Sequence, residues 1–409
     1  MKPVRIGPFP RGVDTFHDPN HRLFQVGRRD KGHYERLTAA DNLSLDDEGN
    51  LFVRPGLTEI LAATAGMTCF SGAGLLLQQD EGVVSSVDPD TGTPTSLVSG
   101  LSDSATIQFV EQAGKVFGTD GTDHFMITSA GVASNWGQTV PPVATLGTTA
   151  GDLPAGRYRV ACVLIDGNGA KSGAPKAAAV TVDGTKDITV TLSSADANAV
   201  YARIYASFTD SDEMYFVSEV AIGALPATIT AVNESNEILD TQFLSGPQGL
   251  PNIVGISKWL GYLLLWRDTR VMHSDGNRHH LFDLRTAPWK FPSTVRAAAG
   301  VGKTCWIATD RGIFTYIGEP PLGELSDPLD KRAYAAGYAI VPVEKLPFLG
   351  GKGFNVVLFA SEDGLAVGFP DGSMRHEHMH QTKWDVAGKT ASIIYRETDD
   401  LAEVIVNLE

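Results

Sequence analysis

The sequence has no run of apolar residues long enough to cross a membrane. Its longest apolar runs, such as residues 259–266, fall far short of the about 20 residues that a membrane-spanning helix needs. The first ten residues include Lys2 and Arg5 but no apolar core of a signal peptide. We therefore expect neither membrane insertion nor secretion by the usual route.

Basic residues are too few to balance the acidic ones. There are 33 Lys and Arg against 48 Asp and Glu, a formal net charge of −15. Proteins that hold nucleic acid through its phosphates need clustered Lys and Arg. The balance argues against tight DNA binding. It remains compatible with DNA passing close by, because an acidic wall repels DNA.

Cysteine is scarce. Cys69, Cys162 and Cys305 are far apart, odd in number and form no C-x-x-C pair. Each lies in an apolar stretch, so we expect three buried free thiols. Such thiols suit a protein that is assembled in a reducing cytoplasm.

Glycine and proline, by contrast, are abundant at 43 and 22 residues. They punctuate short apolar runs, as in all-β chains. Before residue 140, strand-like runs at 75–79 and 83–87 flank a turn, and after residue 251 the runs 304–309 and 313–317 do the same. Repeated hairpins of one type indicate the blades of a β-propeller, with a β-sandwich as the main alternative. Two stretches could form short helices: residues 57–65 and 330–339.

Residues 141–250 have a different pattern between two proline-containing linkers. A run of alternating residues at 155–164 ends at Asp166-Gly167-Asn168-Gly169, a strong hairpin turn, and several more alternating strands follow. These strands suffice for a small sandwich of the fibronectin or immunoglobulin type. We predict an all-β chain in three segments: 1–140, an extended start and the first part of a propeller; 141–250, an inserted sandwich; and 251–409, the rest of the propeller.

Residues 300–304, Gly-Val-Gly-Lys-Thr, resemble the end of a phosphate-binding loop. The full motif needs a glycine at position 297, which is Ala297, and it must open a helix. The residues that follow, 305–309, instead form a strand-like run. A β-turn is the favoured interpretation.

Residues 376–380, His-Glu-His-Met-His, contain the pattern H-E-x-x-H. In metalloproteases this pattern lies on a helix, but the flanking residues here are typical of strand and turn. On a strand, His376, His378 and His380 would project to one side, where three imidazoles could bind a metal. A solvated strand or loop is the favoured interpretation, so we expect no metal and no cofactor.

No other group of residues forms a recognisable catalytic pattern. His279, His280, Asp283 and the scattered serines make no nucleophile arrangement, and G-x-S-x-G is absent. A glycosidase carboxylate pair could be distant in sequence, but nothing points to one. We therefore expect a protein that is not an enzyme and has no catalytic or cofactor-binding residues.

Five tryptophans are spread through the part of the chain after residue 251. Exposed tryptophans would suit carbohydrate binding, whereas buried ones fill the cores of β-blades, which we favour. These residues are Trp259, Trp266, Trp289, Trp306 and Trp384.

Several motifs resemble those of bacteriophage tail nozzle proteins of the tail tubular protein B type. Residues 7–14 look like their glycine-rich opening segment, G-x-x-x-G-x-D, with one more residue between the two glycines, and residues 42–56 are similar to their N-x-x-L/V-D-D-x-G-x-L-x-x-R-P-G stretch. Residues 156–160, 166–173 and 200–205 resemble their fibronectin-like inserts, and Asn277 to Asp283 resembles one of their propeller strands.

This resemblance implies a structural virion protein that is assembled in the host cytoplasm. It would form a ring, of six copies, below the adaptor (the head-to-tail connector) of a short-tailed phage. The ring would line the DNA exit channel, let DNA pass without specific binding and support fibres or a plug. The main alternative is a receptor- or glycan-binding tail or baseplate protein. A propeller hydrolase acting on surface glycans is a third hypothesis, without a supporting motif.

Overall fold

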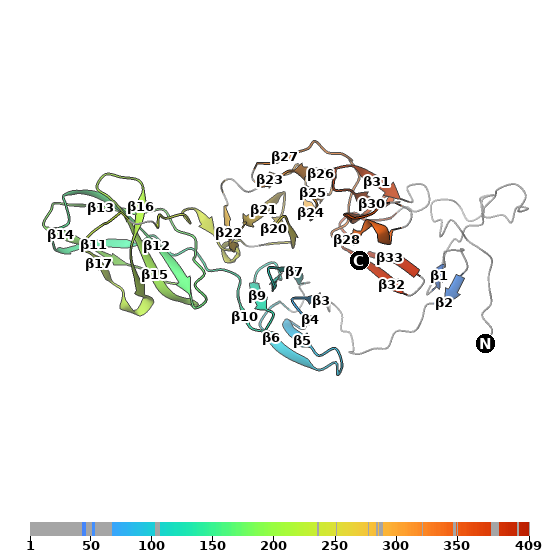
Figure 1. Ribbon diagram of the computed structural model, residues 1–409, viewed down its shortest axis with the longest axis horizontal. Helices are drawn as coiled ribbons and strands as arrows, with labels where there is room; N and C mark the ends of the chain where they lie inside the picture. Colours follow the sequence, from blue (N-terminus) through green and yellow to red (C-terminus); the bar gives the residue numbers. More distant parts are fainter. Residues whose placement is uncertain are drawn as a thin grey trace, which may run out of the picture. The chain divides into compact units, whose positions relative to one another are not determined.

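The computed structural model describes residues 43–45, 51–53 and 68–408 (Figure 1). The last range has gaps at 103–106, 235–236, 251, 277, 284, 286–288, 321, 347–348, 350, 378–383 and 399–400. The regular elements in the described part are β-strands and a few single-turn 3-10 helices. The helix predicted at 57–65 lies outside the described residues.

The chain divides into two compact units: residues 63–290, and residues 1–62 together with 291–409. Both units contain four-stranded antiparallel sheets in which strands adjacent in sequence are adjacent in the sheet. Such meanders are the blades from which β-propellers are built. The protein is thus all-β and propeller-like, with a β-sandwich inserted among the meanders.

In the unit 63–290, two meanders come first. One contains β3 (Thr68–Gly72), β4 (Leu75–Asp80), β5 (Val83–Val87) and β6 (Pro94–Val98). The next contains β7 (Gln108–Gln112), β8 (Lys115–Thr119), β9 (His124–Thr128) and β10 (Ala133–Asn135). The faces of these two sheets share a core that includes Leu77, Val84, Val116 and Ile127.

A third sheet of this unit follows the sandwich in sequence. It contains β18 (Leu244–Ser245), β19 (Gly255–Trp259), β20 (Tyr262–Arg267), β21 (Arg270–Asp275), β22 (Arg278–Asp283) and β23 (Trp289–Lys290). Its core is shared with the second meander through Phe117, Trp136, Leu263 and Phe282. Successive sheets therefore pack face to face, as propeller blades do.

The inserted sandwich consists of two antiparallel sheets. One contains β11 (Thr145–Ala150), β14 (Lys186–Thr191) and β17 (Ala227–Ile229). The other contains β12 (Gly156–Asp166), β13 (Ala178–Val182), β15 (Ala199–Ser207) and β16 (Met214–Ala221). Tyr158, Cys162, Ile188 and Ile204 are among the buried residues between them. These strands all fall within the segment 141–250, although the compact unit extends well beyond it.

The second unit contains two further meanders and a final hairpin. The first meander contains β24 (Val295–Val301), β25 (Thr304–Thr309), β26 (Gly312–Ile317) and β27 (Glu324–Leu325). The second contains β28 (Ala339–Pro342), β29 (Asn355–Ser361), β30 (Gly364–Gly368) and β31 (Met374–Glu377). The hairpin is β32 (Ala391–Thr398) with β33 (Leu401–Leu408), and β1 (Leu43–Leu45) pairs with β2 (Leu51–Val53).

Several hairpins turn through two consecutive residues with positive φ. Glu81-Gly82 joins β4 to β5 with φ values of 45° and 73°, and Leu260-Gly261 joins β19 to β20 with 49° and 84°. Two positive φ values are characteristic of the type I′ turn, whose twist matches that of paired strands. Glycine at the second position therefore fixes the hairpin locally.

The short helix predicted at 330–339 is wrong. Asp330 forms an isolated bridge with Ile313, Tyr334 with Ser361, and Ala336 with Thr390. The segment is therefore extended between two sheets of its unit. Long-range backbone pairing overrides the modest local preference of its alanines for a helix.

Candidate functional site

A connected group of ionisable side chains in the second unit is centred on Asp330. Its Oδ2 atom accepts hydrogen bonds from Arg332 Nη1 at 2.8 Å and from Tyr334 Oη at 2.9 Å. His376 Nε2 on β31 lies 2.8 Å from the same oxygen. Arg332 also bridges to Asp363, in the turn between β29 and β30, at 2.5 Å. We call these five residues the Asp330 cluster.

The side chains of Asp330, Tyr334 and His376 are buried, whereas those of Arg332 and Asp363 are partly exposed. Although burial raises it, hydrogen bonds from Arg332 and Tyr334 hold the pKa of Asp330 below its usual value. Burial lowers the pKa of His376, against the attraction of Asp330. A charged Asp330 and a neutral His376 follow, with His376 Nε2–H donating to the carboxylate. These hydrogen bonds hold the segment after β27 against β31.

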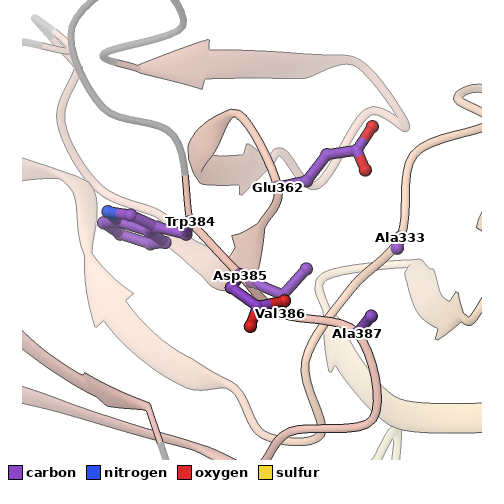
Figure 2. A pocket seen from close by; sticks show the side chains of 6 residues that line it. All are labelled: Ala333, Glu362, Trp384, Asp385, Val386 and Ala387. Carbon is purple, nitrogen blue, oxygen red and sulfur yellow. The ribbon is translucent and has the colours of Figure 1, made fainter. Parts of the chain in front are cut away.

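An open pocket of about 400 Å³ borders the same segments (Figure 2). Its lining residues are Ala333, Glu362, Trp384, Asp385, Val386 and Ala387. In Figure 2 the Trp384 ring and the Glu362 carboxylate point in opposite directions, and Trp384 packs against the neighbouring core. The lining residues that the structure describes therefore offer carboxylates and apolar groups, and none of them is a Ser, Thr, Cys or His side chain.

The resemblance of residues 300–304 to a phosphate-binding loop has no structural counterpart. Val301 pairs with Thr304 across a tight turn between β24 and β25, and Gly302 has φ +55°. The Thr304 hydroxyl donates to the carbonyl of Pro370 at 2.7 Å. The β-turn interpretation is confirmed, because no helix follows to present amide groups to a phosphate.

Of the three candidate metal ligands, the structure describes one. His376 lies on β31, as expected if residues 376–380 follow a strand, but its Nε2 faces Asp330. His378 and His380 lie outside the described residues. Within the described ranges, no group of three or more His, Cys, Asp or Glu side chains is placed to hold a metal ion.

The residues near 280 also serve the fold. His280 Nε2 lies 3.1 Å from the carbonyl of Lys171, in the turn region after β12. Trp136 Nε1 donates to the carbonyl of His279 at 2.9 Å. Asp283 pairs with Arg285. The His280 contact and the bond from Gln138 Nε2 to the carbonyl of Ala170, at 2.8 Å, join the sandwich to its flanking segments, whereas the Trp136 bond joins the two flanking sheets to each other.

The core interpretation of tryptophan and the expectation of buried cysteines are each confirmed only in part. Of the five tryptophans, Trp259, Trp266 and Trp306 are at most 3% exposed, whereas Trp289 and Trp384 are half-buried. Cys162 and Cys305 are buried, but Cys69 is exposed, so the prediction of three buried thiols is wrong for Cys69. Cys69 stands near the start of β3, an edge strand, where little covers it. Burial raises the pKa of Cys162 to about 12.

Sequence reasoning missed a second charged network, which lies on the sandwich. Glu237 Oε1 accepts hydrogen bonds from Lys171 and Arg203, both at 2.6 Å, and from Tyr205 at 2.7 Å. Although burial opposes it, the hydrogen bonds from Lys171 and Tyr205 lower the pKa of Glu237 to about 2. These four residues span 66 positions, so no local motif could have revealed the network.

Comparison with known proteins adds no family. No protein-family model and no curated protein matches the chain. Among solved structures, BBS1N in complex with ARL6DN is similar with a TM-score of 0.34, 10% identity, and coverage of 85% of this chain and 92% of that one. Sqt1 of Saccharomyces cerevisiae has a TM-score of 0.21 and 12% identity, and covers 72% of this chain and 91% of its own. Scores this low carry no functional argument.

Acidification is expected to destabilise the protein between pH 7 and 5. Burial lowers the pKa of five histidines in the folded protein, so near pH 6.5 the unfolded chain binds protons that the folded chain does not bind. The neutral buried histidines therefore make their full contribution to stability above their unfolded-state pKa, and this contribution is lost as the pH falls below it. Each contributes a slope of up to about 1.4 kcal/mol per pH unit. The residues are His124, His273, His279, His280 and His376.

Denaturant unfolding measured at pH 7.5, 6.5 and 5.5 checks this prediction. Carboxylates with lowered pKa, such as Asp330, lose their contribution only at lower pH, so histidines dominate this window. His273→Gln should flatten the slope, because His273 is buried and its Nε2 has no hydrogen-bond partner in the described structure. A stability that is constant or rises toward pH 5.5 would contradict the assignment.

Proposed function

We propose that the protein is a structural component of a bacteriophage tail, namely the nozzle ring around the DNA exit channel below the adaptor. The observation that carries the proposal is the order of modules along the chain. Blade-like meanders precede and follow a two-sheet sandwich, which is the arrangement that the resemblance to nozzle proteins implies. The chain motifs and the module order support the same class of protein.

The chemistry of the side chains supports a scaffold that is not an enzyme. In the described ranges, the carboxylates of the Asp330 cluster and of Glu237 are each paired with an arginine or a lysine of their own group. Such groups fix segments in place and leave no free base beside a nucleophile. The net charge of −15 suits a wall along which DNA slides without binding.

Electron microscopy of the protein, alone and mixed with the adaptor protein of the same phage, tests the proposal. We expect rings of six copies with a central channel, formed on the adaptor where they do not form alone. The partners in the virion would then be other copies of the chain, the adaptor, and fibres or a plug. Monomers that persist in the presence of the adaptor would refute the nozzle role.

Binding of a receptor glycan is the second candidate function, and exposed aromatic side chains on the sandwich favour it. Four of the six tryptophans are buried, but Tyr201 and Phe208 on or beside β15 are 41% and 38% exposed. Exposed aromatic rings can stack on sugars. A glycan array probed with the protein and with Phe208→Ala separates the two functions. A glycan-binding protein should give a signal that the substitution removes, whereas a nozzle without receptor activity should give no signal with either protein.

A further inference from the structure

Two short segments join the sandwich to the sheets that flank it within the unit 63–290. The entry segment is residues 136–144, between β10 and β11, and the exit segment is residues 238–250, which contain β18. The sequence marks both as proline-containing linkers. Modules joined only by a linker move relative to each other unless further contacts hold them. Both segments make such contacts.

The entry segment is bonded to the sandwich at two points. The backbone amide and the hydroxyl of Thr139 both donate to Asp196 Oδ2, each at 3.0 Å. Gln138 Nε2 donates to the carbonyl of Ala170, in the loop after β12, at 2.8 Å. Because Gln138 is only 2% exposed, water competes little for this bond. The chain is therefore fixed to the sandwich before β11 begins.

The exit segment is bonded first to the sandwich and then to the blade sheet. The amide of Ala174, in the loop after β12, donates to the carbonyl of Thr241 at 2.9 Å, and the amide of Phe243 donates to the carbonyl of Ala174 at 3.2 Å. Directly afterwards β18 pairs with β22, where Leu244 lies opposite Asp283. The chain therefore passes from the sandwich to the blade sheet through successive backbone hydrogen bonds.

β22 of the blade sheet also holds the sandwich and the exit segment directly. His280 Nε2 lies 3.1 Å from the carbonyl oxygen of Lys171, in the loop after β12. Arg278 Nη1 donates to Asp240 Oδ2 of the exit segment at 2.7 Å. Contacts from separate segments restrain the sandwich in more directions than a single linker can.

Two glycines let these backbones approach each other closely. A Cβ added to Gly173, in the loop after β12, would collide with the carbonyl of Leu244 in the exit segment. A Cβ added to Gly246 would come within 2.5 Å of the carbonyl oxygen of Gln138 in the entry segment. Both obstacles are backbone atoms, which cannot turn aside as the end of a side chain can. The packing therefore requires residues without a side chain at these positions.

Phe243 of the exit segment has an unfavourable backbone conformation. Its φ of +68° lies in the left-handed region, which a bulky residue rarely adopts. Such a conformation persists only where the surrounding structure imposes it. Here the amide is bonded to Ala174, and the guanidinium carbon of Arg285 lies 4.1 Å from the centre of the Phe243 ring. A freely moving linker would relax this residue, so its conformation indicates a fixed path.

From these contacts we infer that the inserted sandwich is a rigid arm, whose orientation relative to the sheets of its own unit is fixed by the joint. The joint consists of the entry segment, residues 170–174, the exit segment and β22. A rigid arm presents each face of the sandwich in one direction and transmits a load from the sandwich to the blade sheets. The inference concerns a single copy of the chain, so it goes beyond the nozzle role and does not depend on it.

Double electron–electron resonance on the full-length chain tests the rigid arm. Spin labels are attached at Ser129→Cys, in the turn after β9, and at Thr191→Cys, at the end of β14, with Cys69→Ser and the buried cysteines left in place. A reference pair, at Ser129→Cys and Asp90→Cys, lies within the first two meanders, which share a core. We expect one distance for the sandwich pair, distributed as narrowly as that of the reference pair. A broad distribution or several distances would overturn the inference.

Gly173→Ala tests whether the joint causes the rigidity. The added methyl group should push the loop after β12 away from the exit segment and broaden or split the distance distribution of the sandwich pair. Gly167→Ala is the matched control in the same loop, because its Cβ would meet only Val200, at 3.9 Å, and it should leave the distribution unchanged.

The reference pair and the circular dichroism spectrum show whether each variant folds. An unchanged distribution in folded Gly173→Ala would overturn the role of the joint, and if this variant does not fold, Gly246→Ala is judged by the same criterion. Rings that fail to form on the adaptor would count against the nozzle and leave the rigid arm standing. A sandwich that moves freely in a protein that forms rings would do the reverse.

Discussion

Asp330→Ala is expected to lower the free energy of unfolding of the second unit by about 2–6 kcal/mol, because the buried Tyr334 hydroxyl and His376 imidazole each lose their acceptor at about 1–3 kcal/mol. The Asp330 carboxylate is 7% exposed and serves Arg332, Tyr334 and His376 at once. Without the carboxylate, Arg332 pairs with Asp363 alone, and the buried Tyr334 hydroxyl and His376 N–H have no acceptor. Each stranded donor adds its own desolvation cost.

Asp310→Ala is the matched control, since Asp310 also pairs with an arginine in the same unit. The side chains of Arg296 and Asp310 are 25% and 32% exposed, so solvent screens their attraction and the loss should be about 1 kcal/mol or less. Hydrogen exchange read on peptides from β25–β26 and β29–β30 assigns the effect to this unit. Equal losses for the two variants would show that the Asp330 cluster is an ordinary surface ion pair.

The sequence was most informative where the structure is determined locally. Hairpins such as β4–β5 and β25–β26 are bounded by turn residues that must adopt particular backbone angles, so a few adjacent letters specify them. The alternating run at 155–164 likewise marks β12, because the side chains of a strand project to alternate faces. The all-β class and the presence of a sandwich follow from repeated signals of this local kind.

The Asp330 cluster could not be predicted, because packing between sheets creates it. Asp330 and His376 are 46 residues apart and meet because their two meanders stack face to face. The same long-range pairing made residues 330–339 extended where local propensity favoured a helix. His376 was singled out as part of H-E-x-x-H, but no local pattern indicates that its partner is a carboxylate from the segment before β28.

Trp306 should show how two stacked meanders depend on each other. The Trp306 ring of β25 is fully buried and donates from Nε1 to the carbonyl of Phe369 at 3.2 Å. It lies against Gly368 at the end of β30, where an added Cβ would come within 2.5 Å of the ring. Trp306→Ala is expected to cost about 3–5 kcal/mol, and Gly368→Ala should also destabilise, because the ring has no room to retreat.

The double variant distinguishes this contact from two independent defects. When Trp306 is already alanine, the methyl group of Gly368→Ala enters the vacated space, so the combined loss should be smaller than the sum of the single losses. Residues in contact show such coupling, at about 0.5–3 kcal/mol, whereas distant residues add. Gly223→Ala, where nothing lies within 4 Å of the added Cβ, is the neutral control. Additive losses in denaturant unfolding would show that Trp306 does not hold the β30 sheet. Coupling would show that this tryptophan–glycine contact, like the Asp330 cluster, holds the same two meanders together.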